Sequence, residues 1–172
     1  GASKIAGEAL ISAFVSCFDL RACIYRFGNV VGPRGTHGAA LDFLKKLAAN
    51  GGAELEVLGD GEQAKPYLWV GDCVEGMLFG LDHASAPLEV WNLAPPDTTR
   101  VARIAELCVA ASPFPRAPIR FTGGERGWRG DVPRSRMSPD KLAAVGFRVR
   151  HTSDEAVERA VRALAAEVFR PA

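Results

Sequence analysis

The chain has 172 residues, of which 48% are hydrophobic and 24% are charged, an ordinary composition for a globular protein with one domain-sized core. This composition excludes the disordered and fibrous classes. Lys and Arg total 21 against 20 Asp and Glu, which gives a net charge of +1. Nothing in this balance predicts nucleic acid or a membrane surface as a partner, so any anion site must be local.

The sequence also lacks the signals of membrane insertion, secretion and metal binding. No apolar run approaches the roughly 18 residues needed to cross a bilayer, and the N-terminus lacks the basic-then-apolar order of a signal peptide. We therefore expect a cytoplasmic protein without a membrane partner. Four cysteines lie far apart in apolar contexts and form no C-x-x-C pair, and these are Cys17, Cys23, Cys73 and Cys108. They are expected to be reduced packing residues, and no metal site is predicted.

The first predicted elements are a helix and a strand. A helix over residues 3–18 is apolar on most sides, with only Glu8, Ser12 and Ser16 as a narrow polar strip, so it should be buried. The run LRACIYRFGNVVG at 20–32 is rich in β-branched and aromatic residues, which predicts a central strand covered on both faces. A helix followed by a buried strand is typical of an α/β sheet.

The middle of the chain alternates helices and strands. A helix over about 38–49 should end at an Asn-Gly-Gly cluster, followed by the strand LEVLG, the loop DGEQAK and the strand YLWV. Asp72 is a predicted N-cap, with Glu75 at capping-box spacing, for the next helix. After the buried strand VWNLA, a further helix is predicted to start at Asp97 or Thr98.

The last third begins with a loop. Residues 112–136 are rich in Pro, Gly and Arg and contain one short apolar run, IRFTGG. Ser138 with Pro139 should start a short helix that ends at a glycine. Thr152 with Glu155 should cap a final amphipathic helix.

Two features near the N-terminus each allow two interpretations. The segment GNVVGPRG imitates a dinucleotide-binding turn, but Pro33 removes a backbone N–H and the glycine spacing differs, which favours a strand leaving the sheet. Lys4 could form a solvated pair with Glu8 one turn later. Its position beside an apolar helix face instead indicates an ammonium group that needs a partner or a ligand.

Several segments together resemble the C-terminal half of a known family. They are ASKIAGEAL, YRFGNVVGPRG, LGDGEQAKPYLWVGDCVEGM, VWNLA and RGWRGDVPRSRMSPDKLAAVGF. In this order they resemble the extended short-chain dehydrogenase/reductase family, in its nucleotide-sugar epimerase and dehydratase branch, and most of all UDP-glucose 4-epimerase-like proteins. The resemblance implies an α/β fold, with the C-terminal part of a Rossmann-type parallel sheet domain and a small mixed α/β substrate-binding lobe.

The resemblance also implies how the chain is organised. We expect the chain to be the C-terminal half of a longer protein, with 1–35 and 66–95 completing the NAD-binding domain and 36–65 and 96–172 forming the nucleotide-sugar-binding lobe. The family's glycine-rich cofactor loop and catalytic tyrosine would precede Gly1. A homodimer is implied for the intact protein.

The family pattern assigns roles to residues of this chain. Lys4 would lower the pKa of the tyrosine, which is otherwise a poor base at neutral pH, and would bind the ribose of the NAD cofactor. Phe27 and Gly28 would lie beside the nicotinamide. Asn29 would contact the substrate near its diphosphate. Without the matching residues on either side of it, Asn29 would be interpreted as a turn residue.

Further residues are implied for the nucleotide-diphosphate sugar. Lys65 stands where the family more often has arginine, and keeps the charge without the bidentate fork. Trp128 stands where the family's phosphate-binding arginine is usual, so Arg126 or Arg129 would serve instead, with Asp131 beside it. Solvated loop charges are the alternative for that cluster. In the strand ELEVLG, the two residues implied for the base pocket are Leu55 and Val57.

The implied activity of the intact protein is NAD-dependent 4-epimerisation of a nucleotide sugar. A nucleotide-sugar 4,6-dehydratase or decarboxylase begins with the same oxidation and is the alternative within the family. A non-catalytic nucleotide-sugar-binding fragment is the alternative from another class. The isolated chain is expected to be inactive.

Overall fold

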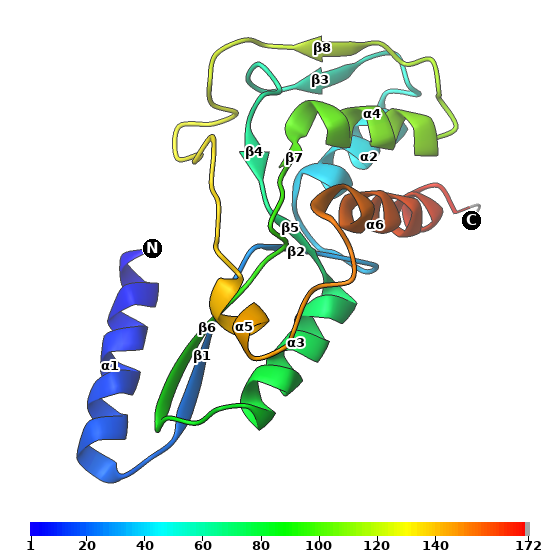
Figure 1. The fold of residues 1–172 in the computed structure, drawn as a ribbon. Coiled ribbons are helices and arrows are strands. Elements are labelled where there is room, and N and C mark those ends of the chain that lie inside the picture. The colour runs from blue at the N-terminus through cyan, green and yellow to red at the C-terminus, as the bar shows by residue number, and fades with distance from the viewer. Residues whose placement is uncertain (171–172) are drawn as a thin grey trace.

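The computed structural model describes residues 1–170 (Figure 1). The helices are α1 (Ala2–Phe18), α2 (Ala39–Ala49), α3 (Val70–Asp82), α4 (Val101–Ala111), α5 (Asp140–Ala144) and α6 (Ser153–Val168). The strands are β1 (Ala22–Phe27), β2 (Asn29–Val31), β3 (Leu55–Val57), β4 (Ala64–Lys65), β5 (Tyr67–Trp69), β6 (Leu88–Leu93), β7 (Thr99–Arg100) and β8 (Ile119–Phe121). In the described part of the chain, no helix is long and apolar enough to cross a membrane.

The strands pair mostly in parallel. β1 pairs with β6, β2 with β5 and β3 with β8, all parallel, while β4 pairs with β7 antiparallel. Parallel partners need a long crossover, and here each crossover carries at least one helix. The register of β2 and β5 sets Asn29 opposite Tyr67, which places both residues beside the cavity described below.

The buried side chains form two clusters. The larger one lies among α2, α4, α6 and β3, with Leu44, Leu47 and Cys108 fully buried. The smaller one joins β5, α3, β6 and α5, and its members are Leu68, Cys73, Trp91, Leu93 and Leu142. Figure 1 shows the same division, with α1, β1 and β6 at one end of the molecule and α2, α4, β3 and β8 at the other.

The predicted burial of the first helix and strand is wrong for the described residues. No residue of α1 is buried, and its large apolar side chains are among the most exposed, Ile5 at 71% and Leu10 at 62%. Within residues 1–170, β1 pairs only with β6, and Ile24 is its only buried residue. Apolar composition had indicated burial, but within residues 1–170 most of these apolar side chains are left uncovered.

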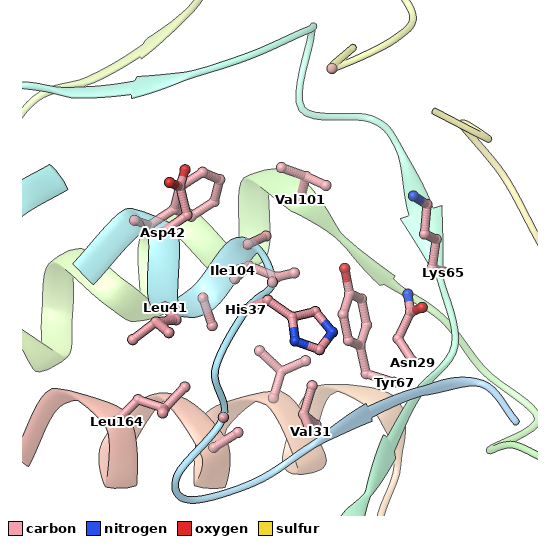
Figure 2. Close-up of a pocket in the computed structure, with 18 of the residues that line it drawn as sticks. Asn29, Val31, His37, Leu41, Asp42, Lys65, Tyr67, Val101, Ile104 and Leu164 are labelled. Carbon is pink, nitrogen blue, oxygen red and sulfur yellow. The ribbon is translucent and has the colours of Figure 1, made fainter. Parts of the chain in front are cut away.

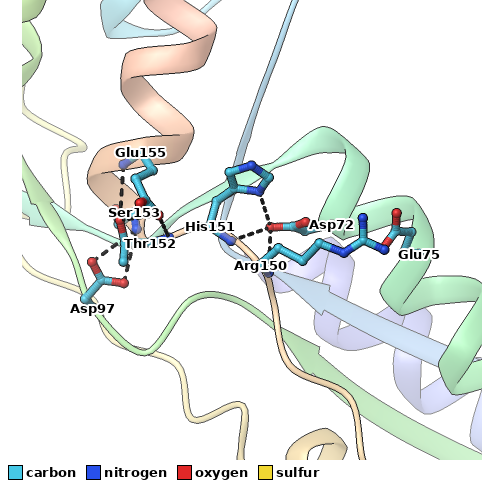
Figure 3. Close-up of polar contacts among 8 residues, drawn as sticks. All are labelled: Asp72, Glu75, Asp97, Arg150, His151, Thr152, Ser153 and Glu155. Carbon is cyan, nitrogen blue, oxygen red and sulfur yellow. Dashed lines mark hydrogen bonds and ion pairs between the residues drawn. The ribbon is translucent and has the colours of Figure 1, made fainter.

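Two of the predicted helix starts are also wrong. α3 begins at Val70, before Asp72, and α4 begins at Val101, after β7. The Asp72 carboxylate is buried and accepts hydrogen bonds from the backbone N–H groups of Arg150 and His151, at 3.2 and 3.1 Å, and lies 3.0 Å from Nδ1 of His151 (Figure 3). It therefore ties the first turn of α3 to the segment that leads into α6.

The predicted capping of the last helix is confirmed. Thr152 Oγ1 accepts from the N–H of Glu155 at 3.2 Å, and the Glu155 carboxylate accepts from the N–H of Thr152 at 2.8 Å. Asp97, expected to cap α4, instead accepts from the N–H of Ser153 in the first turn of α6 (Figure 3). The N-terminus of α6 is thus fixed by carboxylates from two segments.

The cysteines are all free thiols, as predicted, but only two of them are packed in the core. Cys73 and Cys108 are buried, and burial raises the pKa of Cys108 to about 12. Cys17 is exposed on α1 and Cys23 is half-buried on β1. The expectation of packing residues is therefore wrong for Cys17.

Candidate functional site

One cavity of about 680 Å³ lies between the two ends of the molecule, within the size range of small-molecule sites. Residues from β2, α2, β5, α4, α6 and the loop at 127–131 line it. Figure 2 shows its two parts, an apolar side with Leu41, Ile104 and Leu164 and a polar side with Asn29 and Lys65. The cavity can therefore receive a ligand with apolar and polar portions.

The polar side is built where two parallel strands meet. Asn29 donates its N–H to the carbonyl of Pro66 at 2.8 Å, which holds β2 against the chain between β4 and β5. A Cβ atom on Gly28 would lie 2.9 Å from the Pro66 oxygen, so a larger residue would push these chains apart. The close approach of the two backbones sets Asn29, Lys65 and Tyr67 side by side, as Figure 2 shows.

Lys65 and Asp131 form an ion pair in the cavity wall. Nζ of Lys65 lies 2.5 Å from Oδ1 of Asp131, and their side chains are 25% and 9% exposed. Oδ2 of the same carboxylate accepts the N–H of Gly127 at 3.3 Å. Burial alone would raise the pKa of Asp131, but the hydrogen bonds from Lys65 and Gly127 outweigh it and the pKa is lowered. The loop at 127–131 is therefore anchored to β4 by a charged pair.

Tyr67 and His37 both line the cavity, and Figure 2 labels them. Burial, and then the negative charge of Asp131, raise the pKa of Tyr67 to about 12. The phenol is therefore protonated at neutral pH and is suited to donate a hydrogen bond rather than to act as a base. Nδ1 of His37 lies 3.2 Å from the hydroxyl of Thr36, which orients the imidazole.

The N-terminal part of the chain matches a known family. The family model described as the NAD dependent epimerase/dehydratase family matches residues 1–94, more than half of the chain. The chain belongs to this family. The prediction from the sequence motifs is thereby confirmed, and the family is one of NAD-dependent enzymes.

Solved structures of family members share the fold over almost the whole chain. A UDP-galactose 4-epimerase is 34% identical and superposes with a TM-score of 0.84, covering 98% of this chain and 53% of its own. The UDP-glucose 4-epimerase of Thermotoga maritima, solved with UDP-glucose, is 23% identical with a TM-score of 0.80 and the same coverage. The predicted α/β class, with part of a Rossmann-type sheet, is confirmed.

Curated relatives extend the comparison in sequence. A putative UDP-glucose 4-epimerase of Methanocaldococcus jannaschii is 24% identical over 168 residues, 94% of this chain and 51% of the relative. The GDP-mannose 3,5-epimerase of Arabidopsis thaliana is 29% identical over 147 residues, 83% of this chain and 38% of the relative. The chain thus spans about half the length, or less, of these relatives.

Of the three residues implied for the cofactor, Gly28 lines the cavity, whereas Lys4 and Phe27 lie outside it. Lys4 is exposed near the start of α1, one turn before Glu8. Glu8 forms an ion pair of 2.5 Å with Arg26, the residue before Phe27, so the start of α1 lies near the carboxyl end of β1. Phe27 is 41% exposed at that strand end, the edge where α/β sheets bind their ligands.

Four residues implied for the substrate are not in the cavity wall. The side chains of Arg126 and Arg129 are exposed, and neither forms an ion pair within residues 1–170, while Gly127, Trp128 and Asp131 of the same loop line the cavity. Leu55 and Val57 are fully buried in the core. The side chain that reaches the cavity from this segment is Leu58, 45% exposed, because it follows the end of β3.

The cavity residues without a predicted role in binding include Gln63, Tyr67 and Trp128. Tyr67 lies two residues after Lys65. In an extended segment such residues point to the same face, so the predicted role of Lys65 could have indicated that Tyr67 also faces the cavity. Trp128 was visible only as a departure from the family's arginine. Gln63 had no signal in the sequence, because its burial depends on a distant loop.

Proposed function

We propose that the protein, expressed from its complete gene, is an NAD-dependent nucleotide-sugar 4-epimerase. The observation that carries this proposal is the 34% identity and TM-score of 0.84 to a UDP-galactose 4-epimerase over 98% of the chain. The polar side of the cavity supports it, since Asn29 and Lys65 offer an amide and a cation to an anionic ligand.

The residues at the end of β1 fit one end of the cofactor. Phe27 presents an exposed ring at the carboxyl edge of the parallel pair β1 and β6, and Gly28 leaves the adjoining backbone without a side chain. We propose that these residues and Lys4 hold the nicotinamide half of NAD. When bound, NAD accepts a hydride from the sugar and returns it.

Residues of this chain have distinct tasks in the proposed reaction. The ammonium group of Lys4 stabilises the phenolate of a tyrosine, which removes a proton from the sugar hydroxyl. Asn29 and Lys65 bind the diphosphate and keep the sugar near Phe27. Tyr67, protonated at neutral pH, donates a hydrogen bond to the ligand. Asp131 holds Lys65 in place and balances its charge.

To bind the diphosphate, Lys65 must change the partner of its ammonium group. Its Nζ already contacts Asp131, so a phosphate must share or displace that contact. Arg126 and Arg129 remain proposed partners, which requires the exposed loop that carries them to turn toward the ligand. For Leu55 and Val57, we propose contact with the base through their backbone groups only. Their side chains are enclosed in the core.

The proposal is tested with the protein from the complete gene, NAD and UDP-glucose. Formation of UDP-galactose, followed by proton NMR of the anomeric signals, is the expected result. A 4-keto-6-deoxy sugar would instead identify a dehydratase, and loss of carbon dioxide from UDP-glucuronate would identify a decarboxylase. Absence of all three reactions contradicts the proposal.

The 172-residue chain alone is expected to give no turnover. Mixed with NAD and UDP-glucose, it should produce no absorbance at the reduced-nicotinamide band. Appreciable absorbance there would show that residues 1–172 contain a complete catalytic centre, contrary to the role proposed for Lys4.

A further inference from the structure

Ser153 is a buried serine whose hydroxyl joins α6 to the cavity wall. The residue is fully buried in the first turn of α6, and its Oγ accepts the backbone N–H of Tyr67 at 3.0 Å. In the described part of the chain, β5 pairs only with β2, so no further strand is available for that N–H. The Ser153 hydroxyl therefore takes the place of a neighbouring strand at Tyr67.

The register of β2 and β5 explains why Tyr67 needs this partner. Asn29 stands opposite Tyr67 and donates its own N–H to the carbonyl of Pro66. In a parallel pair, the residue directly opposite such a donor points its own N–H away from the partner strand. The N–H of Tyr67 is thus directed to α6, while its side chain lines the cavity.

The hydroxyls around Ser153 can donate in one direction only. Thr99 Oγ1 lies 2.8 Å from Oγ of Ser153 and 2.5 Å from Oδ1 of Asp154. A carboxylate only accepts, and each hydroxyl has a single proton to give. Thr99 therefore donates to Asp154, and Ser153 donates to Thr99. Each bond polarises the next, so the oxygen that accepts the N–H of Tyr67 is held in one place.

Asp97 holds the backbone of the same serine. Both oxygens of its carboxylate lie 3.1 Å from the backbone nitrogen of Ser153 (Figure 3). Ser153 is therefore fixed through its side chain and through its backbone. A residue held in this way is suited to support β5 rigidly.

The phenol of Tyr67 extends this support into the cavity, where Asn29 and Lys65 also lie. Burial raises the pKa of the phenol, and a hydrogen bond from the Asn29 side chain acts in the opposite direction. The phenol oxygen is the far end of a long side chain, so a small rotation of the Tyr67 backbone displaces this oxygen most. The hydrogen bond from Tyr67 to Ser153 thus sets where the phenol oxygen lies beside Asn29.

We propose that Ser153 and Thr99 are positioning residues for ligand binding, which act through the hydroxyl of Tyr67. This inference rests on the proposed function, in which Tyr67 donates a hydrogen bond to the nucleotide sugar and Asn29 binds its diphosphate. Neither Ser153 nor Thr99 lines the cavity. Their effect on affinity therefore passes through β5.

The test measures binding by isothermal titration, with the protein from the complete gene. The ligand is whichever of UDP, dTDP and GDP the wild type binds most tightly. Ser153→Ala should bind it about tenfold more weakly, and Tyr67→Phe should lose about as much. The double variant of Ser153→Ala and Tyr67→Phe should bind no more weakly than either single variant, because no hydroxyl is left to be positioned.

Ser112→Ala is the matched control for stability. Oγ of Ser112 accepts the N–H of Phe114 at 3.1 Å, and Ser112 is buried but does not line the cavity. The two serine variants should lower the temperature of thermal unfolding by similar amounts, because each leaves a backbone N–H without its acceptor. Ser112→Ala should nevertheless keep the affinity of the wild type.

Thr99→Val decides the matter if Ser153→Ala does not fold. Valine has nearly the shape of threonine and lacks the oxygen to which Ser153 donates. Thr99→Val should therefore bind the nucleotide several-fold more weakly than the wild type.

The outcomes distinguish the two proposals. Wild-type affinity in Ser153→Ala or in Thr99→Val, additive losses in the double variant, or an equal loss in Ser112→Ala would each overturn the positioning role while the epimerase proposal stands. If the wild type binds none of the three nucleoside diphosphates, the proposed function fails and the inference fails with it.

Discussion

The pair of Lys65 and Asp131 illustrates how one contact serves both the fold and the site. Asp131 is 9% exposed and its carboxylate holds both Lys65 and the N–H of Gly127, so it fixes the loop that carries Trp128. If Lys65 binds a phosphate as proposed, the phosphate would meet a cation that is already oriented.

Replacing Asp131 by Asn should produce a pH-dependent loss of stability. Because the pKa of Asp131 is lowered in the folded state, its contribution is present above the ordinary value of about 3.9 and is lost as the pH falls through the folded value. Urea unfolding should therefore show Asp131→Asn to be less stable than the wild type at pH 7, with a smaller difference at pH 3. The exposed Asp19→Asn is the control. A difference that is constant across this range contradicts the assignment.

The two tyrosines of the chain should both ionise late. Burial comes first among the causes that raise the pKa of Tyr25 and of Tyr67 to about 12 in each case. Tyr25 also donates its hydroxyl to the carbonyl of Met77 at 2.6 Å. Absorbance at the phenolate band should stay flat through pH 10 in the folded protein and rise near pH 10 in urea. A folded protein with half of its phenolate signal at pH 10 would contradict this.

At the scale of single residues, the sequence motifs located some of the cavity residues and missed others. Asn29 and Lys65 were identified through the motifs around them, and the cavity contains both. Leu55 and Val57 were assigned from the same kind of match, but alternation along β3 turns them into the core. Gln63 could not be predicted, because a local pattern does not show that the loop at 126–131 covers its amide.

At the scale of elements, helix capping shows what a local pattern can decide. Thr152 and Glu155 form the predicted box, since within residues 1–170 their side chains have no other hydrogen-bond partner. Asp72 and Glu75 have the same kind of spacing, but the backbone N–H groups of Arg150 and His151 bind Asp72, and Arg150 pairs with Glu75 at 2.7 Å. Long-range partners therefore decide the second case, and the sequence spacing could not reveal them.

Removing the cap of α6 should weaken the larger core. Thr152→Ala deletes the acceptor for the N–H of Glu155 and should lower the free energy of unfolding by about 1 kcal/mol. Chemical denaturation followed by circular dichroism measures this change. Thr98→Ala, at a half-buried threonine without a side-chain hydrogen bond within residues 1–170, is the control. An equal loss of unfolding free energy in both variants would mean that the capping box makes no specific contribution to stability.

At the scale of the whole molecule, exposed apolar side chains collect on α1 and α3. They include Leu10 and Phe14 on α1 and Leu78 and Leu81 on α3, each more than half exposed. Exposed apolar side chains on a helix face are typical of a surface that contacts another protein surface. The homodimer predicted from the family remains a prediction.

We expect the 172-residue chain to associate as its concentration rises. The double variant Leu10→Lys and Phe14→Lys should shift sedimentation toward the monomer, because charged groups are costly to bury without partners. Lys45→Glu, an exposed change on α2, is the control and should leave the association unchanged. Sedimentation that is independent of concentration in the unmodified chain would contradict the expectation.

The parallel pairing of distant strands also governs how quickly the chain can fold. β1 pairs with β6, and β3 pairs with β8. A large part of the sequence separates the two strands of each pair, so neither strand can form its ladder until the distant partner has arrived. Closing such long loops costs chain entropy before any ladder forms, and proteins rich in non-local contacts fold slowly. During that interval, newly made chains would expose unpaired strand edges, so refolding yield should fall as protein concentration increases.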